Sequence, residues 1–403
     1  MKSFSLFLFS CSAAQTLASF LDNATVSIDV HQQYIYAYSS SFGWLDSNGN
    51  VNGPLSARLV YAAQNGVTVR IIVDSTDDTE QTYPAGPFFQ SIPNISVRYI
   101  NTTLYNHNKG VVIDAYTPNA AVSVASVNWS KTSLTANREA GTIVYDAAIA
   151  NYFAAIFDYD FSQGTIPAAV SAGTVTTTSP TPVAAPTKSY PRLTGYMTIT
   201  AFTNPDNAYC SQLLLPMFAS INRTLHGEMY QITANDLPAA IVTSLTNNPS
   251  IDVTLIVTSA MDGSATSTTD NEQLLYNNGA SIFASSSTFT YTHMKTWTYD
   301  GRYTVVFSGN WADTSITYQG YDYQPNREFG LLFDSTCVSA FWENVYLADR
   351  LIATDFATPQ KCTNYDSCDV CNGDNLFCVT APVFESNGCC STDTNAESVV
   401  RST

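Results

Sequence analysis

The sequence predicts an α/β protein built from two similar halves. One motif, H-x-K-x-x-x-x-D, occurs twice, first from His107 to Asp114 and again from His293 to Asp300. Around each copy, helical segments alternate with short Val/Ile-rich strands in the same order, which favours a mostly buried mixed β-sheet flanked by helices in each half. The copies lie about 190 residues apart, a period far too long for a solenoid. The chain is therefore predicted to contain a duplicated unit.

The repeat extends upstream of the motif, into the first elements of each half. Leu17 to Ile35 aligns with Leu214 to Ile232, and each segment combines an apolar helical stretch with a strand. Val67 to Asp74 aligns with Ile251 to Ser259, and each contains a short strand rich in Val and Ile. We therefore expect each half to run helix, strand, helix, strand, motif strand, second strand and helix.

The spacing inside the motif suits chemistry at a phosphate group. His107 and Lys109 are two residues apart, so both side chains point to one face of an extended segment, and His293 and Lys295 repeat this pattern. An imidazole can attack phosphorus or transfer a proton, and an ammonium group can hold a phosphate oxygen. The chain has only four His and six Lys, so the double occurrence is strong evidence for a site.

Further polar residues repeat downstream of each motif, in a Ser-x-Asn-Trp run and then an Asn-Arg-Glu-x-Gly run. They are Ser126, Asn128 and Glu139 in the first half, and Ser308, Asn310 and Glu328 in the second. The motif aspartates, Asp114 and Asp300, lie off the histidine face and near the strand ends. A structural hydrogen-bonding role is therefore predicted for both aspartates.

These motifs resemble those of the phospholipase D superfamily, the HKD phosphodiesterases, over nearly the whole chain from about residue 15 to 357. The resemblance implies two α/β halves related by a pseudo-twofold axis, with one motif from each half meeting in a single site. It also implies a two-step phosphoryl transfer through a phosphohistidine. The glycine of the family's G-S-x-N pattern is replaced by Ala125 and Phe307, but the His, Lys and Asn positions are all kept.

Roles follow from the resemblance by motif position. His107 would be the nucleophile and His293 the general acid and base. Glu139 and Glu328 would accept a hydrogen bond from a histidine ring and fix its tautomer. The residues implied to contact the phosphoryl group or the rest of the substrate are Lys109, Lys295, Asn128, Asn310, Ser126 and Ser308. No metal or cofactor is expected, because two lysines and two amides can stabilise the charge.

Composition limits the partners. The net charge is −17 with only 16 basic residues, which disfavours a broad nucleic-acid clamp that depends on many Lys and Arg contacts to phosphates. Two motifs in one chain complete a site, so a monomer suffices for the chemistry. We expect a phospholipid or other phosphodiester as substrate and transient contact with a membrane surface. Nucleic acid is expected as a partner only under the alternative function given below.

The cysteines and the N-terminus indicate a secreted or endolysosomal protein. Of nine Cys, six lie in a short tail after residue 358, which favours disulfides and an oxidising compartment. The apolar run after Lys2 is typical of a signal peptide. The predicted glycosylation sites are Asn23, Asn94, Asn101 and Asn222, whereas Asn128 also begins a sequon but is reserved for the site.

The predicted domain organisation has five segments. They are a signal peptide over 1–14, a first phospholipase D-like half over 15–163, a Thr/Pro/Ala-rich linker over 164–193, a second half over 194–357 and a small disulfide-rich tail over 358–403.

Three functions remain open from the sequence. The first is metal-independent hydrolysis of a phosphodiester, most simply a phospholipid head group, and the aromatic residues around both motifs suit a lipid-facing rim. The second is a secretory-pathway exonuclease acting on single strands, because the same aromatic rings could stack on bases. The third is an inactive HKD scaffold that acts as a binding protein, which the intact motifs in both halves disfavour.

Overall fold

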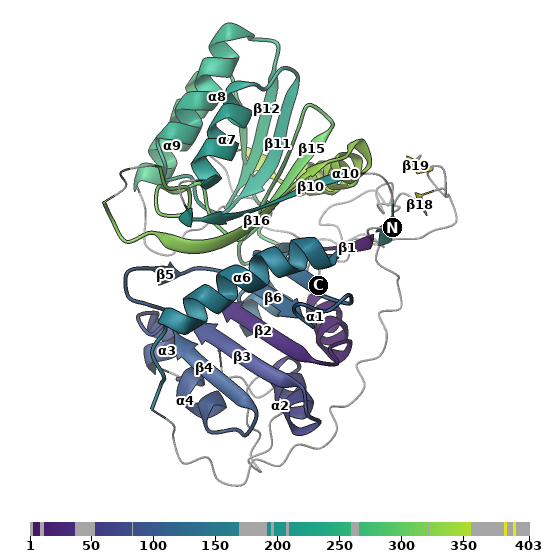
Figure 1. Ribbon diagram of the computed structural model, residues 1–403. Helices are drawn as coiled ribbons and strands as arrows, with labels where there is room; N and C mark the ends of the chain where they lie inside the picture. Colours follow the sequence, from purple (N-terminus) through teal and green to yellow (C-terminus); the bar gives the residue numbers. More distant parts are fainter. Residues whose placement is uncertain are drawn as a thin grey trace.

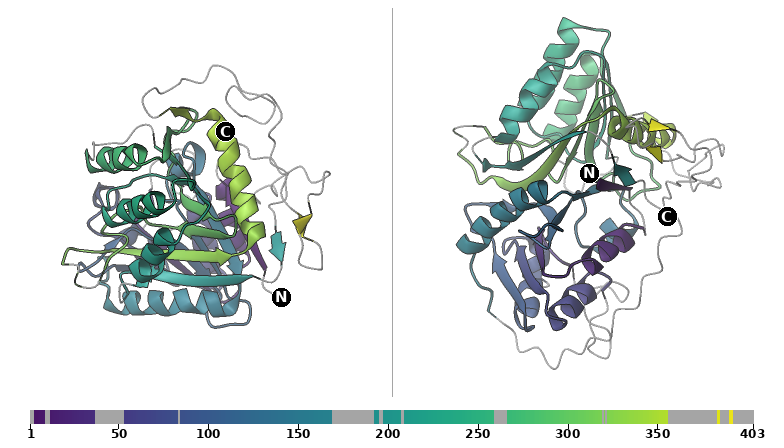
Figure 2. Two further views of the ribbon diagram at one scale, coloured as in Figure 1. Left: turned by 90° about the horizontal axis from the view of Figure 1, so that it is seen from above. Right: turned by 45° about the vertical axis from the view of Figure 1, so that its right-hand side comes forward.

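The computed structural model consists of two stacked α/β halves, each built around one sheet (Figure 1; Figure 2). It describes residues 3–8, 12–36, 53–82, 84–168, 192–194, 197–206, 209–258, 266–318, 320, 322–355, 383–384 and 390–391. This is the predicted fold class, with the two halves related by an approximate twofold repeat of their elements. Most of the predicted tail, and residues 169–191 of the predicted linker, lie outside the described residues.

The first sheet has the strand order β4-β3-β2-β6-β7-β8-β1-β9. Its strands are β1 (Ser3–Leu8), β2 (Ser27–Gln32), β3 (Thr68–Val73), β4 (Ile95–Tyr99), β6 (Lys109–Ile113), β7 (Ala121–Ala125), β8 (Ala140–Tyr145) and β9 (Arg192–Thr194). The helices of this half are α1 (Ser12–Asp22), α2 (Ser56–Gln64), α3 (Asp78–Thr82), α4 (Ala85–Gln90), α5 (Lys131–Thr135) and α6 (Ala147–Gln163).

The second sheet has the order β10-β16-β15-β14-β11-β12-β13-β17. Its strands are β10 (Thr198–Asn204), β11 (Thr224–Met229), β12 (Asp252–Val257), β13 (Ser281–Ala284), β14 (Lys295–Tyr299), β15 (Tyr303–Phe307), β16 (Asn326–Asp334) and β17 (Thr354–Asp355). The helices are α7 (Tyr209–Ala219), α8 (Asp236–Asn247), α9 (Thr266–Asn277) and α10 (Thr336–Ile352). A short pair in the tail joins β18 (Val383–Phe384) to β19 (Cys390–Ser391).

The two halves place the motif strand in the same position. β6 lies antiparallel between β2 and β7, and β14 lies antiparallel between β11 and β15. Outside these pairs, β2-β3-β4 and β11-β12-β13 run parallel, which explains the near-continuous apolar runs of their sequences. Every residue of β6 and β14 is buried. This burial, with Val111, Val112 and Ile113 in β6 and Trp297 in β14, places each motif at the centre of a sheet.

One core cluster spans both halves. It joins Val122 and Val124 of the first sheet and Phe153 of α6 to Leu331 of the second sheet and Trp342 of α10. The helices that supply it begin at clear caps, since Asp146 accepts from the N–H of residue 149 and Ser335 accepts from that of residue 338. In Figure 1, α6 lies between the two halves. Because this core is continuous, the halves form one packed molecule rather than two tethered domains.

The glycine of the second Asn-Arg-Glu-x-Gly run has a packing role. Gly330 pairs with Phe202 across β10 and β16, and a Cβ added at Gly330 would lie 2.1 Å from the Phe202 ring. A larger residue would therefore displace β10. In the first half, Gly141 pairs with Phe7 in the same register between β8 and β1. β1 thus occupies, in the first sheet, the position that β10 occupies in the second.

Two predicted boundaries lie within elements of the structure. The segment 1–14, predicted as a signal peptide, contains β1 and the start of α1 at Ser12. The predicted linker starts at Gly164, but Thr165 bonds to Tyr99 at the edge of the first sheet. Its last residues belong to β9, which pairs with β1 rather than with the second sheet. Backbone pairing that no local pattern announces accounts for both differences.

Cys337, at the start of α10, is disulfide-bonded. No helix among the described residues is long and apolar enough to cross a bilayer.

Candidate active site

The two motif histidines approach each other because each half extends a segment onto the other half. The short strand β5 (Tyr105–Asn106), just before His107, pairs in parallel with Asn326 and Arg327 of β16. The equivalent contact precedes the other histidine. Arg138 forms a parallel bridge with Thr292, and the His293 N–H donates to the Arg138 carbonyl at 2.7 Å. Each histidine therefore reaches the site beside the Asn-Arg-Glu run of the opposite half.

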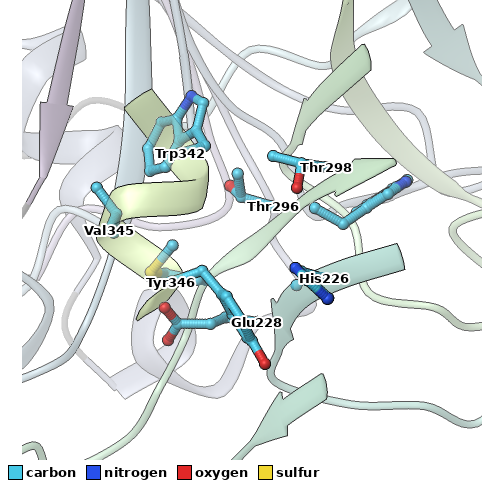
Figure 3. A pocket seen from close by; sticks show the side chains of 10 residues that line it. His226, Glu228, Thr296, Thr298, Trp342, Val345 and Tyr346 are labelled. Carbon is cyan, nitrogen blue, oxygen red and sulfur yellow. The ribbon is translucent and has the colours of Figure 1, made fainter. Parts of the chain in front are cut away.

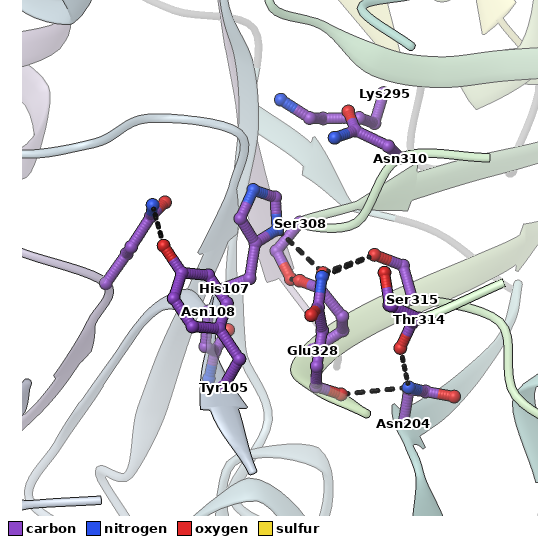
Figure 4. Close-up of polar contacts among 12 residues, drawn as sticks. Tyr105, His107, Asn108, Asn204, Lys295, Ser308, Asn310, Thr314, Ser315 and Glu328 are labelled. Atoms are coloured by element: carbon purple, nitrogen blue, oxygen red, sulfur yellow. Dashed lines mark hydrogen bonds and ion pairs between the residues drawn. The ribbon is translucent and has the colours of Figure 1, made fainter. Parts of the chain in front are cut away.

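Each histidine ring is held by the glutamate of the other half. His107 Nδ1 lies 2.7 Å from Glu328 Oε1 (Figure 4). His293 Nδ1 lies 2.9 Å from Glu139 Oε2. Both glutamates are fully buried, so each is well placed to stabilise a protonated ring. A bond at Nδ1 leaves Nε2 as the nitrogen that can meet phosphorus or a leaving oxygen.

The two motif lysines are buried beside the histidines. Lys109 Nζ donates to the His107 carbonyl and to Gln33 Oε1, the latter at 3.1 Å. Lys295 Nζ donates to the His293 carbonyl at 2.9 Å and lies 5.2 Å from the centroid of the Tyr230 ring. The two ammonium groups are thus held in similar places by different neighbours.

Burial and mutual repulsion weaken the basicity of all four groups. Burial lowers the pKa of His107 to about 4 against the opposing effect of Glu328, and it lowers the pKa of His293 to about 4 against Glu139. Burial also lowers the pKa of Lys109 to about 8. The pKa of Lys295 falls well below its usual range, first through burial and next through Lys109. The two lysines are therefore near enough to repel, and a bound anion would relieve this strain.

The repeated asparagines line the same region. Asn128 and Asn310 are each 6% exposed, and the buried side-chain oxygen of each has no hydrogen-bond partner. The Asn310 amide donates to Gln231 Oε1 at 3.1 Å. Asn310 is therefore oriented by a residue that follows β11.

The two serines take a different role from the predicted contact with substrate. Ser126 Oγ donates to Glu139 Oε2, and Ser308 Oγ donates to Glu328 Oε2, both at 2.5 Å. Each Oγ also accepts a backbone N–H at 3.0 Å. Because these hydroxyl protons are committed to the glutamates, the serines orient the glutamates rather than the substrate. Sequence position alone could not separate these roles.

The motif aspartates lie away from the histidines and bind backbone. Asp114 Oδ1 accepts the N–H groups of Thr25 and Val26 at 2.9 and 2.7 Å. Asp300 Oδ1 accepts those of Asn222 and Arg223 at 3.1 and 2.8 Å. These bonds anchor the segments that lead into β2 and β11. The structure therefore separates the aspartates from the group formed by the other motif residues.

Tyrosines beside the motifs form part of the site that the sequence reasoning missed. Tyr105 stacks against His107 with ring centroids 6.5 Å apart, and its hydroxyl contacts Gln33 and Asp77. Tyr230 meets His293 edge-on at 4.9 Å. For Tyr105 a signal was available, since it lies two residues before His107; Tyr230 follows β11, and no motif points to it.

The predicted glycosylation sites are distributed as surface sites would be. Asn23, Asn94 and Asn222 are exposed and Asn101 is half-buried. Asn128 is buried, as its place in the site requires.

A second, small cavity lies between the second sheet and α10. It is lined by His226, Glu228, Trp342 and Tyr346, among others, and by neither motif histidine (Figure 3). The His226 ring stacks on Tyr346 with centroids 4.9 Å apart, which attaches α10 to β11. Met294, Thr296 and Thr298 of the second motif also line it, but neither His293 nor Lys295 does. No group of three or more His, Cys, Asp or Glu among the described residues could hold a metal ion.

Comparisons with known proteins found similarity in the sequence of the first half and in the fold of the chain. Residues 17–161 match the family model described as "Cardiolipin synthase, PLD-like domain". The solved phosphatidylserine synthase of Haemophilus influenzae Rd KW20 is similar in structure, with a TM-score of 0.62 at 13% identity over 87% of each chain. The polyphosphate kinase of Porphyromonas gingivalis gives a TM-score of 0.55 at 10% identity, over 86% of this chain and 50% of that one.

A third solved structure aligns with less than half of the chain. Nuc of Salmonella typhimurium, described as a phospholipase D family member, is covered completely by 40% of this chain, with 16% identity and a TM-score of 0.35. No curated protein sequence matches the chain significantly. The family match is therefore confined to the first half, and the similarity of the whole chain to the solved structures is one of fold.

Proposed function

We propose that this protein hydrolyses a phosphodiester through a covalent phosphohistidine, with no metal ion. One observation carries the proposal: two histidines from opposite halves are each bound at Nδ1 by a buried glutamate, beside two buried lysines. A nucleophile and an acid, each oriented by a carboxylate, are what a two-step displacement at phosphorus requires.

In the first step, His107 Nε2 attacks phosphorus and a P–N bond forms as the P–O bond to the leaving alcohol breaks. Protonated His293 gives its Nε2 proton to the departing oxygen. In the second step, neutral His293 takes a proton from water, the hydroxide attacks phosphorus and the P–N bond breaks. His107 is released and His293 is again protonated, so the cycle closes. Glu328 and Glu139 stabilise whichever ring carries positive charge.

Charge on the phosphoryl oxygens is met by the lysines and asparagines. Lys109 and Lys295 repel each other, so an anion placed between them is favoured and keeps both protonated. The side chain of Asn310 is fixed by its neighbour, so it can donate to phosphoryl oxygens without reorganising. Preorganised donors of this kind account for much of the catalysis in such sites.

For the substrate we propose the head-group phosphodiester of a phospholipid, approached at a membrane surface. The net charge of −17 opposes a polyanion such as nucleic acid more than a substrate with a single phosphodiester. The structural likeness to an enzyme named phosphatidylserine synthase adds support for a lipid. The tyrosines beside the histidines provide apolar faces around the reacting group.

The test offers purified protein two substrates in the presence of EDTA. One is a fluorescent phosphatidylcholine in mixed micelles, and the other is a 5′-hydroxyl single-stranded oligonucleotide. Head-group release is expected. Stepwise shortening of the oligonucleotide would instead show that nucleic acid, and not lipid, is the substrate. Loss of all activity with EDTA would contradict the metal-free mechanism. Inertness toward both, in a folded protein, would favour the binding-scaffold alternative.

We also propose that the protein works in a secreted or endolysosomal compartment. The disulfide at Cys337, the six tail cysteines and the exposed sequons support this location. Signal-peptide removal after residue 14 would delete β1 and leave β8 as an edge strand. Intact-mass analysis of protein purified from culture medium would show whether β1 is kept, and recovery only from the cytosolic fraction would contradict secretion.

A further inference from the structure

Two buried arginines connect each half to a helix of the other half. Arg327 of the second half donates from Nη2 to Asp160 Oδ1 of α6 at 2.9 Å, and Arg138 of the first half donates from Nε to Asp349 Oδ2 of α10 at 2.7 Å. Their exposures are 2% and 0%. The two contacts are equivalent in the internal repeat. Arg327, in the Asn-Arg-Glu run of the second half, contacts the end of α6, the helix that follows the run of the first half. Arg138, in the run of the first half, contacts the end of α10, the helix that follows the run of the second half.

Each arginine directly precedes a glutamate that holds a histidine. In extended backbone, neighbouring side chains point to opposite faces, so Glu328 faces His107 while Arg327 faces α6. Both His107 and α6 belong to the first half. Arg327 and Glu328, which are adjacent in the second half, therefore both contact the first half, from opposite faces of β16.

The backbone contributes a third contact. Asn326 and Arg327 pair in parallel with Tyr105 and Asn106, the residues that lead directly to His107. The distance from Glu328 to the His107 ring thus depends on how closely this strand is held to the first half. A displacement of about 1 Å in such a pair can cost about 100-fold in rate.

We propose that Arg327 and Arg138 are positioning residues, and that their ion pairs with Asp160 and Asp349 hold each catalytic glutamate against the histidine of the opposite half. The proposal rests on the proposed function, in which those two histidines carry the chemistry. It assigns the ion pairs a task beyond stability, since buried apolar residues would stabilise the interface equally well.

The same helix offers a matched control. Asp158 of α6 accepts from Arg70 Nη1 at 2.6 Å, and Arg70 also donates to Asp29 at 2.7 Å. These residues all belong to the first half, so this ion pair crosses no boundary between halves. Asp158→Asn therefore removes a carboxylate from an ion pair within the first half. Asp160→Asn removes one, two residues further along the same helix, from an ion pair between the halves.

The bridging variant is expected to fold. Arg327 Nη1 also contacts Asp206 Oδ2 at 2.5 Å, within its own half, so Asp160→Asn leaves the buried guanidinium paired. Asp160→Glu keeps the carboxylate and serves as the conservative rescue. Arg138→Met tests the second bridge independently.

The experiment compares kinetics and histidine titration in the full chain. Asp160→Asn should lower kcat at least about 10-fold with KM changed less than about 3-fold, while Asp158→Asn should leave kcat near wild type. Asp160→Glu should recover part of the loss. Equal kcat in the two Asn variants, at equal folded fraction, would overturn the proposal.

Titration of the four histidine rings by NMR gives a readout that needs no substrate. Asp160→Asn should lower the pKa of His107, which loses its close glutamate, and leave His293 unchanged; Arg138→Met should do the reverse. If the pKa values of His107 and His293 are unchanged in both variants, the ion pairs have a structural role only. If wild-type protein cleaves no phosphodiester yet shows this crossed pattern, the proposed function fails and the positioning survives.

Discussion

At the scale of single residues, the two glutamates differ in how fully their oxygens are occupied. Glu328 accepts from Ser308 at 2.5 Å and from Ser315 at 2.8 Å besides its contact with His107. Glu139 accepts from Ser126 at 2.5 Å and from Asn137 at 3.2 Å besides its contact with His293. The contacts to Glu328 are the shorter set, and its pKa is lowered by His107 despite the opposing effect of burial. The two halves of the site are therefore similar but not interchangeable.

The division of labour between the histidines leads to the first prediction. His107→Ala should abolish turnover and covalent labelling, because it removes the attacking nitrogen. His293→Ala should lower turnover by about 1,000-fold or more yet still allow labelling from a substrate with a good leaving group, which needs no acid. Mass spectrometry of acid-free digests would locate the phosphoryl group. A phosphoryl group found on His293 instead would exchange the two roles.

The pH dependence is the second prediction. Burial lowers the pKa of both histidines to about 4, so the protonated form that His293 needs as an acid is lost as pH rises above that value. The bound phosphate anion opposes this effect and raises the pKa in the complex. We expect kcat/KM to have an acidic optimum and to fall toward neutral pH. The corresponding fall in kcat should occur at a higher pH than the fall in kcat/KM. A rate that is flat from pH 4 to 8 would contradict this titration.

At the scale of elements, the motif aspartates connect chain segments that are distant in sequence. Asp114 has a positive φ of 51° and Asp300 one of 54°, a backbone region that Asp and Asn tolerate better than most residues. From that turn, each carboxylate reaches the backbone N–H groups before β2 or β11. The motif aspartate therefore anchors the strand that neighbours the motif strand, which is β2 in the first half and β11 in the second.

This contact gives the third prediction. Asp114→Ala leaves the N–H groups of Thr25 and Val26 without their acceptor and should lower the free energy of unfolding by about 2–4 kcal/mol. The variant should keep kcat within about threefold, because no site residue loses a partner. Urea unfolding followed by kinetics on the folded fraction would measure both. Large loss of kcat without loss of stability would place Asp114 in the chemistry instead.

Element prediction from the sequence succeeded where the pattern is local. The motif strands and the helices α6 and α10 lie where the repeated segments of the two halves predicted a strand or a helix. β5 was not foreseen, because two residues carry no periodicity and the strand exists only through pairing with Asn326 and Arg327. β1 lies within the segment predicted as a signal peptide, because an apolar run near a terminus suits either.

At the scale of the whole molecule, the site lies between halves of one chain. The continuous core under α6 and α10 holds the halves together, and each half contributes one histidine, one lysine and one asparagine. The crossed contacts of His107 with Glu328 and of His293 with Glu139 mean that neither half by itself pairs its motif histidine with a glutamate.

The fourth prediction follows from this arrangement. A mixture of His107→Ala and His293→Ala proteins should remain inactive, because each chain lacks one member of its own site and the halves do not exchange. Activity of the wild type should scale linearly with protein concentration. Recovery of about a quarter of wild-type activity on mixing, or after refolding together, would instead indicate a site shared between chains.

The sequence by itself determined the repeat and was enough to propose the chemistry. Spacing of two residues between His and Lys, repeated in both halves, was sufficient to predict a phosphate site, because side chains on a strand alternate faces whatever the sheet around them. The tertiary structure alone decided which glutamate serves which histidine, that Ser126 and Ser308 hold the glutamates, and that two arginines bridge the halves. Those partners are 13 to 221 residues apart along the chain, and only the packing of one half against the other brings the distant ones into contact.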